Sequence, residues 1–227
     1  MSSFGTVLKN LDWGYLVDLL LQIIPALLCI MIHEICHGAA AYALGDRTAA
    51  TQGRLSLNPL RHVDWFGLLM LAIFHFGWAR PVSVDIRNFK HPKRDMALTA
   101  LAGPVSNFVL AALALFVFGL LFRSLNGNKT GEYLLDLLNS MAYLSVSLGL
   151  FNLIPFPPLD GSKVLFAFLP DRAYVRMMYL ERYGMIALIV IVVAMNRLCR
   201  VSPVAAASQA VYEFFFRFAE LAYSLVK

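Results

Sequence analysis

The sequence predicts an all-α polytopic membrane protein, with about five to six hydrophobic helices and a short β-hairpin or strand after the first of them. Of the 227 residues, 59% are hydrophobic and only 15% are charged, whereas a soluble domain is typically about half apolar and about one-quarter charged. The mean hydropathy of +0.68 agrees with this class. Apolar segments take up most of the chain, so we expect a single membrane-embedded domain over residues 1–227.

The first apolar segment runs from residue 15 to residue 44. A helix of that length is about 45 Å long, which exceeds the roughly 30 Å hydrocarbon core of a bilayer. We therefore expect this helix to tilt or to project from the membrane, with Pro25 as a candidate kink.

Two different segments follow. Residues 45–64 read "GDRTAATQGRLSLNPLRHVD", and their glycine, threonine and serine content, with the alternation in "GRLSLN", predicts a short strand or hairpin. Residues 65–79 are apolar, but about 15 residues fall short of the usual spanning length. This shortness favours a re-entrant or tilted segment.

Three later apolar segments predict membrane helices at 96–122, 133–155 and 184–198. In the tail, 204–227, polar residues recur every three or four positions and so share one helical stripe: Glu213, Arg217, Glu220, Ser224 and Lys227. A lipid-facing spanning helix rarely carries such charges without partners. We predict an amphipathic helix that lies in the interface or packs along the bundle, with Glu213 and Arg217 paired. The alternative is a sixth spanning helix whose stripe faces other helices.

The basic residues orient the chain. If the first helix enters from outside and residues 65–79 do not cross, loops 46–95 and 161–182 share one side and carry eight and four Lys or Arg. The opposite side carries seven. This excess predicts that the end of the first helix lies near the cytosolic face. No basic run with interleaved aromatic residues occurs outside the apolar segments, so nucleic acid is not expected as a partner.

The first apolar segment contains three ionisable residues in "HEICH", residues 33–37. Positions i and i+4 share a helical face, so His33 and His37 can both reach one Zn²⁺. Glu34 can then act as the general base for a zinc-activated water. The alternative is a pair of core histidines that are hydrogen-bonded to neighbouring helices. Ionisable groups at membrane depth are costly and usually functional, which favours the zinc interpretation.

Catalytic zinc needs a third protein ligand and an open position. The candidates are His62, Asp64, His75, His91, the acidic residues of 133–155 and Asp160. We favour Asp160 because "NLIPFPPLDG" (152–161) places three prolines at the end of an apolar helix, where the backbone must unwind. Non-helical backbone at membrane depth is tolerated only where it lines a cavity or is buried in protein. The alternative is an ordinary helix end, with Asp160 capping the next helix.

Two amides lie inside apolar segments. Asn107 and Asn152 are candidate substrate-binding residues that would hydrogen-bond a substrate backbone or a developing oxyanion. The alternative is that they link neighbouring helices, a contribution of about 1 kcal/mol each.

The sequence resembles the site-2 protease family of intramembrane zinc metalloproteases in three motifs, "HEICH", "AGPVSN" and "NLIPFPPLDG". The motifs also occur in the same order as in that family. The stretch from "GRLSLNPLRHVD" to "GWARPV" is similar to the short bacterial branch, and no PDZ or CBS domain is expected. The resemblance implies His33, His37 and Asp160 as zinc ligands and Glu34 as the catalytic base. It also implies an integral membrane location, in a bacterial inner membrane. Since His33 and His37 lie towards the end of the first helix, the distribution of basic residues predicts an active site near the cytosolic face.

The resemblance implies an endopeptidase that hydrolyses a peptide bond within or next to a transmembrane segment. Its partners would be the lipid bilayer and a single-span membrane protein or signal-peptide remnant as substrate. The alternative is a catalytically silent relative that binds membrane proteins without cutting them. Loss of Glu34 or of a ligand would mark that state, and all four residues are present.

Overall fold

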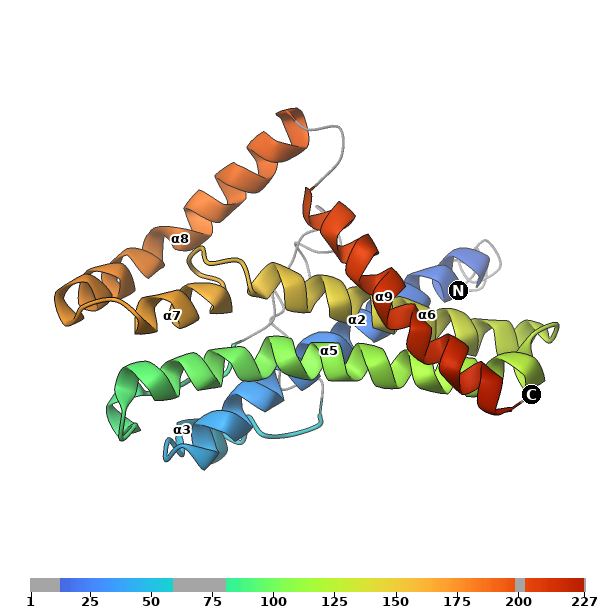
Figure 1. The fold of residues 1–227 in the computed structure, drawn as a ribbon, viewed down its shortest axis with the longest axis horizontal. Helices are drawn as coiled ribbons and strands as arrows, with labels where there is room; N and C mark the ends of the chain where they lie inside the picture. The colour runs from blue at the N-terminus through green and yellow to red at the C-terminus, as the bar shows by residue number, and fades with distance from the viewer. Residues whose placement is uncertain (1–12, 59–80, 199–202, 227) are drawn as a thin grey trace, which may run out of the picture.

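The computed structural model describes residues 13–58, 81–198 and 203–226 (Figure 1). These residues form seven α-helices and the 3-10 turn η2 (Ile86–Asn88), and they contain no strand. The helices are α2 (Trp13–Ala43), α3 (Thr48–Thr51), α5 (Pro92–Leu125), α6 (Lys129–Asn152), α7 (Asp160–Ala167), α8 (Asp171–Leu198) and α9 (Pro203–Leu225). The all-α prediction is therefore confirmed for the described part of the chain.

Within the described residues, three helices are long and apolar enough to cross a membrane: residues Ile23–Ala43 of α2, all of α5 and all of α6. By length and composition, these helices agree with the predicted membrane protein. α5 begins with Pro92 in its first turn, where the missing N–H of proline leaves no hydrogen bond unmade. It ends before Asn126, and Gly127 turns the chain with a φ of 87° that favours glycine. The side chain of Asn128 then accepts a hydrogen bond from the Thr130 amide and caps α6.

α5 is the central helix of the bundle, and α2, α6 and α9 pack against it (Figure 1). The core between α5, α6 and α9 consists mainly of small residues: Ala111, Ala114, Leu115, Ala142, Val146 and Ala219. Small side chains let helix backbones approach closely, which is the usual basis of helix association in membranes. One such close approach is at Gly119 of α5, where a Cβ would lie 2.1 Å from the carbonyl oxygen of Ala219.

The C-terminal helix α9 packs along the bundle, in agreement with one form of the prediction. The four described residues of the polar stripe are all exposed: Glu213, Arg217, Glu220 and Ser224. The predicted pairing is different, however. Glu213 accepts a hydrogen bond from Gln209 at 3.0 Å, and Arg217 lies 5.5 Å from the ring centre of Phe214.

The predicted β-hairpin or strand after the first helix is wrong for the residues described there. Residues 48–51 form the short helix α3, and residues 53–58 form no strand. Asp46 accepts a hydrogen bond from the backbone N–H of Thr48 at 3.0 Å, which favours a helical start over extended backbone. Gly53, with a φ of 65°, then ends the turn. The rest of the predicted hairpin and the apolar segment 65–79 lie outside the described residues.

The region 161–182, expected to be a loop, is largely helical. It contains α7 and the first part of α8, since "DRAYVRMMYLER" has no proline or glycine to stop a helix. α8 extends away from the body of the bundle (Figure 1), and it is not one of the three helices that meet the length and hydropathy required of a span.

Candidate metal centre and active site

The two histidines come from one face of α2, as the i, i+4 spacing predicted. His33 and His37 are buried, with 4% and 8% of their residue surface exposed. Their rings meet edge to face, with the centroids 4.4 Å apart. Both Nε2 atoms therefore point into the same small volume, and they lie 2.9 Å from each other.

Asp160 reaches the histidines because the chain unwinds after α6. α6 ends at Asn152, residues 153–159 form turns and bends, and α7 begins at Asp160 itself. The next residue must be small. A Cβ on Gly161 would lie 2.1 Å from the carbonyl oxygen of Leu153, so glycine lets α7 fold back against the end of α6. The proline-rich break thus places one carboxylate beside α2, as predicted.

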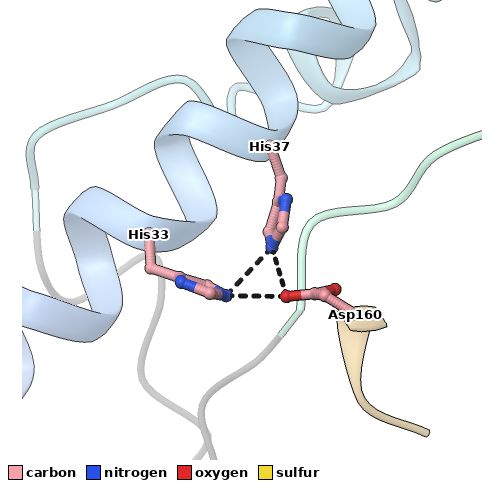
Figure 2. Close-up of side chains that lie close together, drawn as sticks. All are labelled: His33, His37 and Asp160. Atoms are coloured by element: carbon pink, nitrogen blue, oxygen red, sulfur yellow. Dashed lines mark hydrogen bonds and ion pairs between the residues drawn. The ribbon is translucent and has the colours of Figure 1, made fainter. Parts of the chain in front are cut away.

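Figure 2 shows the resulting cluster, in which His33, His37 and Asp160 point toward one another. Asp160 Oδ2 lies 3.1 Å from Nε2 of each histidine. Asp160 is itself only 7% exposed. Burial raises the pKa of Asp160, whereas its contacts with the His33 and His37 imidazoles lower it by more, so the net pKa lies below the usual range. Binding of a cation requires that both Nε2 atoms have lost their protons, and the two nitrogens and the carboxylate oxygen then all offer lone pairs.

This donor set fits zinc. Two imidazole nitrogens and one carboxylate oxygen form a group that could hold a metal ion, and such a three-ligand set is typical of catalytic zinc. Tetrahedral zinc with bonds of about 2.0–2.1 Å places its ligand atoms about 3.3 Å apart. The observed separations of 2.9–3.1 Å are close to that value.

Each imidazole has an outer partner on α5 that orients its ring. His37 Nδ1 donates to the carbonyl oxygen of Thr99 at 2.7 Å, which leaves Nε2 free as a ligand. His33 Nδ1 lies 3.1 Å from Nδ2 of the fully buried Asn107, and Asn107 Oδ1 has no hydrogen-bond partner among the described residues. Rotating this amide by 180° exchanges the two atoms, so that Oδ1 accepts the Nδ1 proton and leaves the second Nε2 free.

Glu34 lies beside the cluster and has a defined orientation. Its Oε2 accepts a hydrogen bond from the backbone N–H of Val82 at 2.8 Å. Together with the metal-binding cluster it lines a cavity of about 180 Å³. A cavity of this size has room for several waters. Water in this cavity can therefore reach both the Glu34 carboxylate and the three metal-binding side chains.

The other residues that the sequence singled out take different places. Asn152 lines the cavity, and its Nδ2 donates to the Leu148 carbonyl at 3.0 Å. Asn107 does not line the cavity; its side-chain amide contacts the His33 ring instead. His91 precedes α5 as its N-terminal cap and is exposed, away from the cluster. His62, Asp64 and His75 lie outside the described residues.

Comparison with known proteins places the chain in a family. The sequence profile of peptidase family M50 matches residues 124–195. "Putative zinc metalloprotease YwhC" of Bacillus subtilis (strain 168) is 39% identical over 176 residues, which cover 75% of this chain and 79% of YwhC. The chain belongs to peptidase family M50. Rip2 of Mycolicibacterium smegmatis, which has the same description, is 27% identical over 190 residues, covering 81% of this chain and 71% of Rip2. No solved structure matches.

Membership of M50, the family of site-2 proteases, confirms the resemblance suggested by the three motifs. The chain is a zinc metalloprotease of the membrane, and its three apolar helices and its two-histidine, one-aspartate cluster agree with that. Neither the comparisons nor the described residues favour the catalytically silent alternative.

Several residues of this M50 site were not predicted, because their roles depend on tertiary approach. Thr99 contacts His37 through its backbone carbonyl, and Val82 contacts Glu34 through its backbone amide. Lys163 lines the cavity with its Nζ 3.7 Å from Asp160 Oδ1 and 3.9 Å from Glu181 Oε1. Of these contacts, only the pairing of Lys163 with Asp160 could have been predicted from the sequence, because residues at i and i+3 are neighbours on a helix.

Gly103 is the residue of "AGPVSN" that this site requires to be small. A Cβ there would lie 2.4 Å from His37 Nε2 and 2.6 Å from His33 Cε1, so the side chain of an alanine would occupy the space of the imidazoles. We expect Gly103→Ala to lower zinc affinity by at least about ten-fold, a loss comparable to that of an outer partner of a ligand. Zinc affinity is measured by competition with a chromophoric chelator.

The matched control for Gly103→Ala is Gly119→Ala in the same helix. That Cβ would meet the backbone of Ala219 in α9, so the variant should lower thermal stability and leave zinc affinity unchanged. Equal zinc affinity in Gly103→Ala and the unaltered protein would show that α5 does not restrict the imidazoles.

Proposed function

We propose that this M50 protease hydrolyses a peptide bond within or next to the transmembrane segment of a single-span membrane protein or signal-peptide remnant. We also propose that residues 1–227 form a single membrane-embedded protease domain. The observation that supports it most is that Glu34 and the group of His33, His37 and Asp160 line one cavity between the membrane helices. A protease of this kind must supply water to the peptide bond inside or beside the bilayer, and this cavity has room for water.

In this proposal, His33, His37 and Asp160 hold the zinc ion. Bound zinc supplies Lewis-acid chemistry, which makes water more acidic and polarises the peptide carbonyl. Glu34 accepts the proton of the attacking water and delivers it to the leaving amine. The hydrogen bond from the Val82 amide restricts the Glu34 carboxylate to one orientation, which suits a base that must act on a water in a fixed position.

The two asparagines have separate roles in this proposal. Asn107 orients His33 rather than touching substrate, since its amide is buried against that ring. Asn152 lines the cavity and remains the candidate for a hydrogen bond to the substrate backbone. Because the amides of a helical substrate are occupied by their own hydrogen bonds, the substrate has to unwind before such contacts form.

Co-expression with single-span membrane proteins tests the proposed function. A substrate should be cleaved in cells that make the unaltered chain and remain intact in cells that make Glu34→Gln. Cleavage by both proteins would place the hydrolysis outside this site.

We also propose that the protein lies in the bacterial inner membrane with its active site near the cytosolic face. The support is the distribution of basic residues, twelve of which fall in 46–95 and 161–182, against seven elsewhere. In the structure, the metal-binding end of α2 lies near the start of α5, whereas the α5–α6 turn lies at the far end of both helices (Figure 1).

Single cysteines at two exposed positions test this orientation, in a protein that lacks Cys29, Cys36 and Cys199. Gln52 follows the metal-binding end of α2, and Asn126 lies in the α5–α6 turn. In intact cells, a membrane-impermeant maleimide should label a cysteine at Asn126 and should label one at Gln52 only after permeabilisation. The reverse pattern would place the active site at the outer face.

A further inference from the structure

Asp46 is a buried carboxylate outside the metal-binding cluster that forms an unusually complete set of hydrogen bonds. Its surface is 0% exposed. Oδ2 accepts from the Asp85 amide at 2.8 Å, and Oδ1 accepts from Asn88 Nδ2 at 2.8 Å. The amide and hydroxyl of Thr48 also donate to Oδ1. Burial raises the pKa of Asp46, but these hydrogen bonds lower it by more, so the group is ionised.

The donors in these contacts belong to two parts of the chain. Thr48 starts the short helix after α2, whereas Asp85 and Asn88 lie about 40 residues later, in the segment 81–88 that precedes α5. We name residues 81–88 the strap. Asp46 thus joins the end of the metal-binding helix to the strap, through a backbone donor and a side-chain donor.

The strap reaches the active site at its other end. Val82 donates its amide to Glu34 at 2.8 Å, and Val82 and Val84 line the cavity. The strap also lies close to α2. A Cβ on Gly38, one helical turn after Glu34, would come within 3.2 Å of the Val82 side chain. Two carboxylates, Glu34 on α2 and Asp46 just beyond its end, therefore hold backbone amides of the strap that are three residues apart.

This arrangement makes the position of Glu34 depend on the register of the strap. A slip by one residue moves an extended chain by about 3.3–3.6 Å, which exceeds the length of a hydrogen bond. The Val82 amide can meet Glu34 only while the far end of the strap stays in place. Asp46 is the buried anion that holds that end, since it accepts from both Asp85 and Asn88.

We propose that Asp46 is a positioning residue for proteolysis: it fixes the strap to the end of α2, and the strap holds the Glu34 carboxylate through the Val82 amide. The proposal rests on the role of Glu34 proposed above. Asp46 touches neither the metal-binding cluster nor the cavity. It acts on the reaction only through the strap.

The test is amide hydrogen exchange in the zinc-loaded protein, resolved for single residues. Asp46→Asn keeps the size of the side chain but removes the charge and replaces one acceptor by an NH₂ group. We expect the amides of Asp85 and Val82 both to exchange at least about ten-fold faster, with zinc content unchanged. On a single-span substrate found by co-expression, kcat should fall about ten-fold or more with KM little altered.

Asp95→Asn is the matched control. Asp95 is equally buried, but it accepts hydrogen bonds from the His91 amide and from Arg94 at the start of α5 rather than from the strap. This variant should speed exchange at His91 and leave Val82 unchanged. If Asp46→Asn does not fold, Asn88→Ala removes one donor to Asp46 at an exposed position. It should speed exchange at Asp85 and Val82 by a smaller factor.

Exchange that rises at Asp85 but stays at the original rate at Val82 would overturn the proposal, since Asp46 would then be only a local loop contact. Unchanged kcat in Asp46→Asn would overturn it as well. The base role of Glu34 is tested separately, because Glu34→Gln would remain active if that role were wrong, whatever the exchange rates in Asp46→Asn.

Discussion

Glu34→Gln should retain its zinc and lose nearly all proteolysis. The amide has the same shape as the carboxylate and keeps an oxygen that can accept from the Val82 amide, but it cannot take a proton from water. General-base catalysis contributes roughly 10²–10⁴-fold, so cleavage of a single-span substrate should fall by that factor. Zinc per chain, measured by elemental analysis, should match that of the unaltered protein.

The control for this variant is Glu213→Gln, which makes the same chemical change on the exposed stripe of α9. It should retain both zinc and activity. Turnover of Glu34→Gln at a rate near that of the control would require a different base, and loss of zinc would mean that Glu34 is a ligand.

Removing any of the three cluster residues should remove the metal together with activity. His33→Ala, His37→Ala and Asp160→Ala each leave two of the three donors that converge within the cluster. Replacing an outer partner of a zinc ligand lowers metal affinity by about 10–100-fold. Replacing a ligand itself should therefore lower zinc affinity by more than about 100-fold. The unaltered protein should bind about one zinc per chain, and each variant should lose it on dialysis against a weak chelator.

His91→Ala separates this ligand set from the alternatives in the sequence. His91 is the residue before α5, is exposed, and belongs neither to the metal-binding group nor to the cavity lining, so the variant should keep its zinc. Full zinc retention in Asp160→Ala would mean that the third ligand is another residue, and His62, Asp64 and His75 would then be the next to replace.

The parts of the site that were predictable from sequence are those set by local geometry. A helix brings His33 and His37 to one face whatever surrounds it. The prolines before Asp160 force the backbone to unwind, and the unwound segment brings the carboxylate to α2.

The parts that were not predictable depend on contacts between distant segments. The strand predicted at "GRLSLN" relied on alternation and on the glycine, threonine and serine content of 45–64, whereas the hydrogen bond from Thr48 to Asp46 and the turn at Gly53 favour α3 and a loop. Asn107 was predicted either to contact substrate or to link neighbouring helices, because an amide in an apolar segment needs a partner. Its partner is His33, 74 residues away, and no local pattern reveals such a pairing.

Asp160 is synthesised long after the histidines that it meets. It follows His37 by 123 residues, and at a translation rate of about 5–20 residues per second this interval lasts roughly 6–25 s. During that time the first membrane helix has already been made. It carries His33, His37 and the carboxylate of Glu34, but the third member of the metal-binding cluster, Asp160, is still missing. Zinc acquisition is therefore a late event in biogenesis. It can be completed only once the "PLDG" segment has emerged from the ribosome, and the nascent helix α2 must be stable in the membrane without it.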